Sequence, residues 1–364
     1  MSIPTTITAR PLGRSTLRGV RTVAGQEFRL RLRTGRWRLL LLAWFVALAG
    51  ITAMLWQAAD SVAGLRQRGV PIFGGLMIVL LSLSLLVVPA LSGQSVNGDR
   101  ERGVLATLQV TLLTPTEIAL GKLAAAWGVS LVFLLLAVPM AVSTMFAGGV
   151  GVGRLIVSLL VLACLLGVVA AISQCWSALV QRTRLSTVLS NLSVFALTIG
   201  TLIAFGLVLP ITRGTHTVTE QVPDETRMQA ELQAGTFNPA EIPMITQTVT
   251  KTEVRTEKVW WLLAPNPYVI LADAAPEKHQ PFSLDASSGD QPAGTFDPLA
   301  GVANAVRDAR QGSSTSNLSE PKGAGPVWPW GLGFDVLLGA GAVVITIRRL
   351  RTPSRRLPRG VRVA

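Results

Sequence analysis

Five long stretches without a charged residue constrain this chain more than any other feature. They cover residues 39–59, 69–98, 123–153, 155–181 and 185–212. Each exceeds the roughly 18 consecutive apolar residues that mark a candidate membrane-spanning helix. Charged residues make up 15% of the whole chain, against about 25% in ordinary soluble domains. The pattern argues strongly against a soluble enzyme.

The apolar runs predict an all-α polytopic membrane protein with six transmembrane helices. Tryptophans near the span ends fit interfacial anchors, and Asp335 makes the sixth span the weakest. The predicted spans are Leu39–Trp56, Phe73–Ser92, Ile118–Phe146, Leu155–Trp176, Val188–Pro210 and Trp330–Ile347. Five of them fall within residues 39–210 and the sixth within 328–347.

The distribution of charge predicts the orientation of these spans. Residues 1–38 hold nine arginines and one acid, and residues 348–364 hold seven arginines and no acid. Residues 211–327 hold nine basic and 14 acidic residues. Basic loops and tails stay on the cytoplasmic side. We therefore expect a multi-pass protein of the cell membrane, with both basic tails in the cytoplasm and residues 211–327 outside.

The basic charge also raises the alternatives of nucleic-acid binding and of a transit peptide. The arginines flank membrane spans, where anionic lipid headgroups explain them, so we expect membrane lipids and no nucleic acid as partners. Within residues 1–38, one helical face carries Leu17, Val20, Ala24 and Phe28. This spacing favours an interfacial helix before the first span.

The segment between the second and third spans predicts a short helix followed by a sharp corner. Asp99 is a suitable N-cap after the Asn97-Gly98 turn. Leucines at positions 105, 108 and 112 give residues 100–113 a short apolar stripe. Pro115 disfavours the helical conformation at Thr114, so the helix should end near residue 113.

The third span then begins with a capping box. Thr114 and Glu117 have the Thr-x-x-Glu spacing, and Pro115 takes the first helical position. Lys122 is expected to extend back to the cytoplasmic headgroups. Local physics leaves two interpretations open: a well-made helical hairpin, or a lever that a cytoplasmic partner pushes.

A family resemblance favours the lever. The residues Glu101-Arg102-Gly103, then Leu112-Leu113-Thr114-Pro115, then Gly121-Lys122 resemble a motif of ATP-binding-cassette (ABC) transporter permeases of the type-2 exporter class. The resemblance covers about residues 15–210 and 328–350. Val104 departs from the usual Thr, and residues 211–327 are much longer than the family's usual outer connection.

The resemblance implies a coupling helix at 100–113 that docks on a separate ATPase subunit. The implied contact residues are Glu101, Arg102, Gly103, Leu105, Leu108 and Leu112, and the implied corner residues are Thr114, Pro115, Glu117 and Lys122. It also implies a second permease subunit, identical or related. ATP and magnesium would be bound by the ATPase, so this chain would need no cofactor of its own.

The chain offers no motif for chemistry. A Walker A loop needs Ser or Thr after Gly-Lys, but Leu123 follows Gly121-Lys122. Cys164 and Cys175 would lie about 16 Å apart on one helix, and the two histidines form no metal spacing. We therefore expect a non-enzymatic subunit. A receptor or assembly factor that works through residues 211–327 is the alternative.

The outer segment should combine strands and helix in an extracytoplasmic α+β insertion. Thr215–Val222 and Ile245–Val259 have the Thr/Val richness of strands, and Asp224–Ala234 reads as a short helix. Trp260–Ala272 should lie at the outer membrane surface or against the bundle, or form a re-entrant helix pair. Residues 281–327 resemble a flexible linker. The insertion is either a small cap or a lid or docking surface for substrate.

The substrate itself cannot be read from the sequence. Aliphatic, sparsely polar spans favour a lipid-like or amphipathic molecule. Asp335 is the one acid within a predicted span. Because it lies about 7 Å below Trp330 along the helix axis, we expect hydration at the level of the headgroups.

Overall fold

The computed structural model describes residues 17–32, 35–61, 67–101, 113–223, 228–229, 232, 234, 244–275, 297–312 and 325–351. The chain forms two units. A helical unit comprises residues 1–201, 263–306 and 326–364, and a smaller unit comprises residues 202–262 and 307–325.

Six helices are long and apolar enough to cross a membrane, as predicted. They are Trp37–Ser61, Gly69–Glu101, Pro115–Phe146, Val152–Leu179, Thr183–Thr212 and Trp328–Leu350. Each contains one predicted span and extends past it by several residues at one or both ends. The sixth span is an uninterrupted helix despite Asp335.

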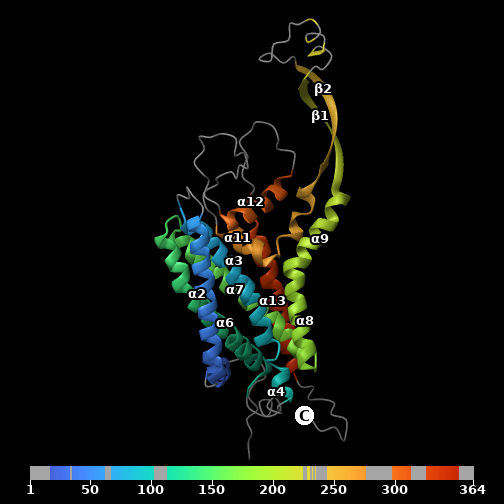
Figure 1. Ribbon diagram of the computed structural model, residues 1–364. Helices are drawn as coiled ribbons and strands as arrows, with labels where there is room; N and C mark the ends of the chain where they lie inside the picture. Colours follow the sequence, from blue (N-terminus) through green and yellow to red (C-terminus); the bar gives the residue numbers. More distant parts are fainter. Residues whose placement is uncertain are drawn as a thin grey trace, which may run out of the picture. The chain divides into compact units, whose positions relative to one another are not determined.

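The helical unit is built from helices throughout the residues that the structure describes (Figure 1). In chain order they are α1 (Leu17–Leu32), α2 (Gly35–Ser61), α3 (Gly69–Ser92), α4 (Asn97–Glu101), α6 (Pro115–Phe146), α7 (Val152–Leu179), α8 (Thr183–Phe195), the π-helical turn η1 (Ala196–Gly200), α11 (Pro267–Ala274), the part of α12 (Pro298–Gln311) up to Val306, and α13 (Trp328–Leu350). The helix α9 (Thr201–Val208) follows η1 directly.

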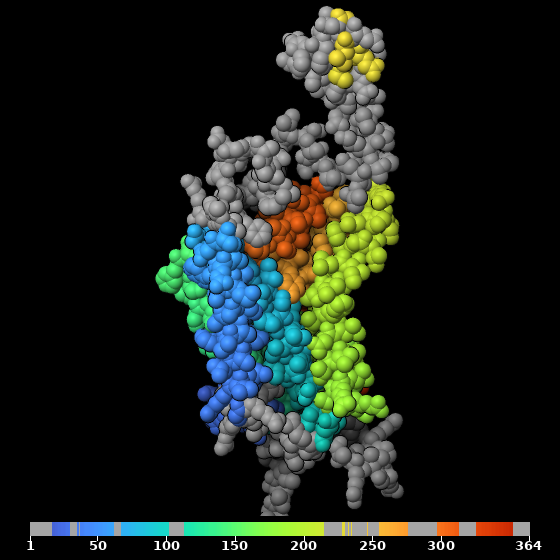
Figure 2. All heavy atoms as spheres, in the orientation of Figure 1, coloured from blue at the N-terminus to red at the C-terminus, as the bar shows by residue number. Residues whose placement is uncertain are grey.

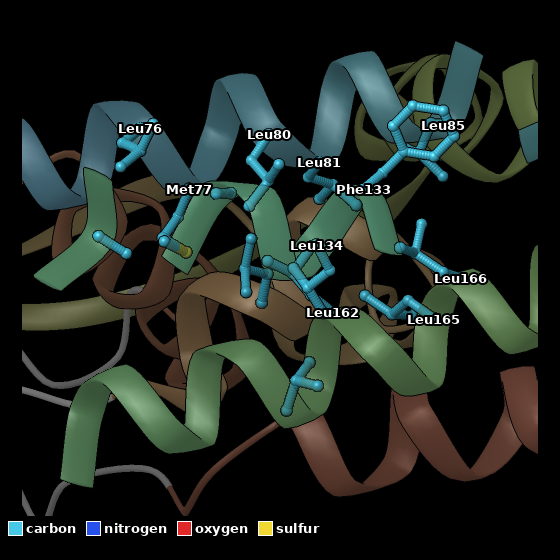
Figure 3. Close-up of a cluster of buried hydrophobic side chains, with 14 of the residues drawn as sticks. Leu76, Met77, Leu80, Leu81, Leu85, Phe133, Leu134, Leu162, Leu165 and Leu166 are labelled. Atoms are coloured by element: carbon cyan, nitrogen blue, oxygen red, sulfur yellow. The ribbon is translucent and has the colours of Figure 1, made fainter. Parts of the chain in front are cut away.

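The core of the helical unit lies where α3, α6 and α7 meet. Leucines from α3 and α7 and Phe133 of α6 interlock there (Figure 3). In the most apolar part of each span, 61% of α7 is buried but only 6% of the span that contains α8. The helices α2, α3 and α8 line one face of the unit (Figure 2). The helix α7 is therefore central. The exposed part of the fifth span follows α8, whereas α8 itself buries Ser186, Ser190 and Val194.

The smaller unit contains a two-stranded antiparallel sheet, so both predicted strands exist. β1 (Arg213–Pro223) pairs with β2 (Met244–Val254) in a register that joins Arg213 to Val254 and Pro223 to Met244. The second strand ends earlier than predicted, and short 3-10 turns, η3 (Thr256–Lys258) and η4 (Trp260–Leu262), follow it. The predicted helix Asp224–Ala234 lies largely outside the described residues.

The flexible linker predicted for residues 281–327 is wrong for the helix α12, Pro298–Gln311. Asp297 Oδ1 accepts a hydrogen bond from the backbone N–H of Leu299 at 3.0 Å, and Pro298 takes the first helical position. Leu299, Ala303 and Val306 are buried along one face. A capped start and an apolar stripe thus form a helix inside a Gly/Ser-rich segment.

The segment Trp260–Ala272 is the other part of the insertion with several predicted placements. From Leu263 onward it belongs to the helical unit. Asn266 caps α11 by accepting from the N–H of Tyr268 at 2.9 Å, and α11 packs against α13 and α7. Placement against the bundle is therefore confirmed for this part.

Candidate functional site

The predicted corner lies at the end of the helical unit where α4, the N-terminal end of α6 and the C-terminal end of α13 come together (Figure 1). Residues 93–101 follow α3 and include α4. Side chains of several other helices contact them. We call these residues the α3–α4 junction. Leu350 at the end of α13 packs with Val96 of the junction.

The start of α4 differs from the prediction. The helix begins at Asn97, so Asp99 occupies its first turn and is not the N-cap. The capping acceptor comes instead from α7, where Ser177 Oγ accepts hydrogen bonds from the N–H groups of Val96 and Asn97 at 3.0 and 3.1 Å. A hydroxyl 80 residues away thus satisfies backbone donors that would otherwise be buried and unpaired.

Lys122 is the electrostatic centre of the site. Its ammonium group donates to Glu27 of α1 at 2.5 Å, to the Ser95 carbonyl at 3.0 Å, and to the carboxylate of Asp99. An ammonium group has three N–H donors, so these contacts saturate it. Its side chain is 1% exposed. The prediction that Lys122 extends to the headgroups is therefore wrong, because three acceptors surround it inside the protein.

The predicted capping box forms at the start of α6. Thr114 Oγ1 accepts from the Glu117 N–H at 3.2 Å, and Glu117 Oε2 accepts from the Thr114 N–H at 2.7 Å. Pro115 takes the first helical position. Glu117 is buried, and α1 closes over it at Gly19, where an added Cβ would lie 2.5 Å from the carboxyl carbon. The corner is thus fixed both locally and by α1.

The helix α1 exists as predicted, but its packing differs. It packs along α6, with Val23 buried against Gly121, where an added Cβ would lie 2.6 Å from the Val23 Cβ. Leu17, assigned to the apolar face, is 89% exposed. α1 turns the face that carries Gly19 and Val23 toward α6. Gly19 on α1 and Gly121 on α6 have no Cβ, so the two helices can approach closely.

The helix α8 contacts both ends of the α3–α4 junction. Ser186 Oγ donates to the Gly93 carbonyl at 2.8 Å, and Thr183 donates to the carboxylate of Glu101. Glu101 is exposed at the end of the described part of α4. The other predicted ATPase contacts, Arg102, Gly103, Leu105, Leu108 and Leu112, lie outside the described residues.

Several residues of the site escaped the sequence analysis. Ser177 and Ser186 supply hydrogen bonds, and Glu27 supplies a carboxylate to Lys122. Two signals were available. Glu27 is the one acid among the nine arginines of residues 1–38, and Ser177 is a polar residue within the uncharged stretch 155–181, directly after the predicted span.

The contacts of the site tie several helices together at one end of the helical unit. Among the described residues, no group of three or more His, Cys, Asp or Glu side chains could hold a metal ion. The contacts connect the α3–α4 junction directly to α6, α7, α8 and α13, and through the ammonium group of Lys122 to α1. Since buried ionic contacts are costly to separate, a displacement of this junction would be passed to its neighbours.

Comparison with protein-family models and with curated proteins finds no match for this chain. The geometry and the sequence motif therefore carry the functional argument.

Proposed function

We propose that this chain is the membrane-spanning subunit of an ATP-driven exporter of the ABC type. A separate ATPase subunit binds ATP and magnesium, and this chain converts its movement into export. The observation that carries the proposal is the connection of the α3–α4 junction to five other helices, directly beside the segment that resembles a coupling helix. A helical hairpin without a mechanical role needs no such connections.

The two ends of the proposed coupling segment support a transfer of force into the helices. Residues 102–112 lie between Glu101 and Leu113, and both flanking regions are anchored. Glu101 contacts Thr183 of α8, and Thr114 forms the capping box of α6. A push from the ATPase therefore acts on α8 and α6 together. ATP favours one arrangement of the helices over another by its differential binding to the two states.

The assembly follows from the same proposal. The described residues contain one set of six candidate spans, so a second permease subunit, identical or related, completes the pathway, and each subunit takes one ATPase. The protein resides in the cell membrane with both basic tails in the cytoplasm. Residues 211–327 then face the exterior as an α+β insertion.

An apolar cavity supports a lipid-like or amphipathic substrate. It has a volume of about 460 Å³ and is open to one side, and α3, α8, η1 and Tyr268 line it mostly with apolar side chains. Ser82 and Tyr268 share a hydrogen bond of 2.7 Å there, and Asn191 adds an amide. Such a lining accommodates an apolar body and orients a small polar group.

The test begins with the partner. The tagged chain is purified from its own membranes in mild detergent, and co-purifying proteins are identified by mass spectrometry. We expect a protein with a Walker A loop, together with ATPase activity. A complex without such a protein, held through residues 211–327, would instead support the receptor or assembly-factor alternative.

A second measurement tests the coupling itself. Hydrogen exchange in α3, α6, α7 and α8 is compared with and without ATP plus vanadate, which traps the ATPase. We expect a change in the native complex and in Ser173→Ala, because Ser173 Oγ bonds only to its own helix at the Val169 carbonyl. In Ser177→Ala the ATPase should respond while the helices do not. An identical response in both variants contradicts the proposal.

A further inference from the structure

Asp335 on α13 is a carboxyl group buried in the membrane-spanning part of the chain. The residue is 1% exposed, so hydration at headgroup level, the sequence-based expectation, is wrong. Its Oδ1 has no hydrogen-bond partner within the part of the chain that the structure describes. Among the described residues, no cation pairs with this carboxyl group.

Asp273 on α11 provides a direct comparison within the same unit. It is 0% exposed, but its Oδ2 accepts from the backbone N–H groups of Val327 and Trp328 at 2.6 and 2.8 Å. These bonds stabilise a negative charge next to the first turn of α13. Asp335 lies further along the same helix without any such donor. The two aspartates are thus equally buried, but hydrogen-bond donors surround the carboxylate of Asp273 and not the carboxyl group of Asp335.

Among the described residues, the cationic groups on the neighbouring helices are engaged elsewhere or are distant. On α7, Arg154 pairs with Asp297 at 2.5 Å, and the Cys164 thiol is close enough to interact electrostatically with Asp335. On α6, Lys122 is saturated by its three acceptors. The nearest basic residue on α13 itself, Arg348, is 13 residues away, or about 20 Å along the axis.

The cost of an isolated charge decides the protonation state. An ionised carboxylate in a medium of low dielectric constant loses its hydration and gains nothing in return unless a cation or donors replace water. The neutral acid avoids this loss. One turn below Asp335, Gly339 of α13 lies against Val168 of α7, because an added Cβ there would be in van der Waals contact with Val168 at 3.4 Å.

We propose that Asp335 is a proton-binding site within the membrane, occupied while α13 is packed on α7. The proton is held on the carboxyl group itself. When the contact opens and water enters, the proton passes to a water molecule and leaves a carboxylate. Because the site is buried within one chain, its occupancy in the packed state does not depend on an ATPase partner or on transport.

Infrared spectroscopy of the purified chain in lipid vesicles reads this state directly. A protonated carboxyl group has a carbonyl stretching band that an ionised carboxylate lacks, and this band shifts in deuterated water. We expect the band in the native protein and in Asp273→Asn, and its loss in Asp335→Asn. Asparagine has the shape of the neutral acid, so Asp335→Asn should retain its unfolding temperature.

Two results would overturn the proposal. One is a difference spectrum between the native protein and Asp335→Asn that contains carboxylate bands, which would show a hydrated, ionised group. The other applies if Asp335→Asn fails to fold. The native protein is then labelled with carbon-13 at its aspartate carboxyl carbons, and the absence of any isotope-shifted protonated band would refute the site.

Discussion

Lys122 of α6 donates a hydrogen bond to Glu27 of α1 across 2.5 Å, and only 1% of the lysine side chain is exposed. The two residues are 95 positions apart, so this contact makes the N-terminal helix part of the helical unit. Asp99 of α4 receives another donor of the same ammonium group. One buried cation therefore holds together three helices at the corner of the proposed coupling site.

Removal of this cation should strongly destabilise the chain. Lys122→Met removes the ammonium group from the Glu27 and Asp99 carboxylates, and breaking a buried ion pair from one side costs about 3–5 kcal/mol. Unfolding in detergent measures the loss. The triple variant Lys122→Met, Glu27→Gln, Asp99→Asn should recover much of it, because no unpaired charge remains.

The control for that prediction is the exposed pair of Arg68 with Asp60, whose side chains are 50% and 54% exposed. Arg68→Ala should cost less than about 1 kcal/mol. Equal losses for Lys122→Met and Arg68→Ala would show that Lys122 is not held as the structure has it.

A second prediction concerns the contact between α1 and α6. An added Cβ at Gly121 would lie 2.6 Å from the Val23 Cβ and 3.1 Å from the Val20 carbonyl oxygen. Gly121→Ala should therefore push α1 away and raise hydrogen exchange across residues 17–32. Gly128→Ala on the same helix meets nothing closer than Phe28 at 3.9 Å. It should stabilise the helix by up to about 1 kcal/mol. Unchanged exchange in Gly121→Ala would contradict this packing.

The sequence could predict what is local. The spans follow from runs of apolar residues, and the capping box depends on Thr114 and Glu117, three residues apart. The environment of Lys122 was not predictable in the same way, because Glu27 and Asp99 lie 95 and 23 residues from it. Without knowledge of those partners, a lysine near a span end is expected to reach water.

Two other errors had different causes. Hydration of Asp335 was predicted only from its distance to Trp330 along the helix axis. Its burial depends instead on how α13 packs on α7. The helix α12 was missed because Gly, Ser and Pro dominate the surrounding segment. Its signals were present in Asp297, Pro298 and the buried spacing of Leu299, Ala303 and Val306.

A third prediction concerns Asp297, which serves two partners. Its Oδ2 pairs with Arg154 at 2.5 Å, and its Oδ1 caps α12; both side chains of the pair are 6% exposed. Asp297→Asn keeps a capping oxygen but leaves Arg154 without its counter-charge beside the Phe73 ring. We expect a lower unfolding temperature with α12 still helical. Asp297→Ala should lose more, since the cap also disappears.

Hydrogen exchange across residues 297–306 separates these two roles of Asp297. Slow exchange in Asp297→Asn and fast exchange in Asp297→Ala would confirm that the cap and the ion pair act separately. Fast exchange in both would show that the ion pair alone holds α12.

The last prediction tests whether the corner transmits force, and it rests on the proposed ATPase partner. Pro115→Ala combined with Glu117→Ala removes the fixed entry into α6 and one half of the capping box. Loss of a cap costs about 1 kcal/mol, which is small enough for the chain to insert and fold. The ATPase should still hydrolyse ATP, while ATP plus vanadate no longer changes hydrogen exchange in α6.

Thr116→Ala is the matched control, because Thr116 lies in the same turn of α6 and takes no part in the capping box. It should behave as the native chain does. If the double variant also responds to ATP plus vanadate as the native complex does, force does not pass through this corner. The ionic contacts of Lys122 would then be the remaining route from the α3–α4 junction into α6.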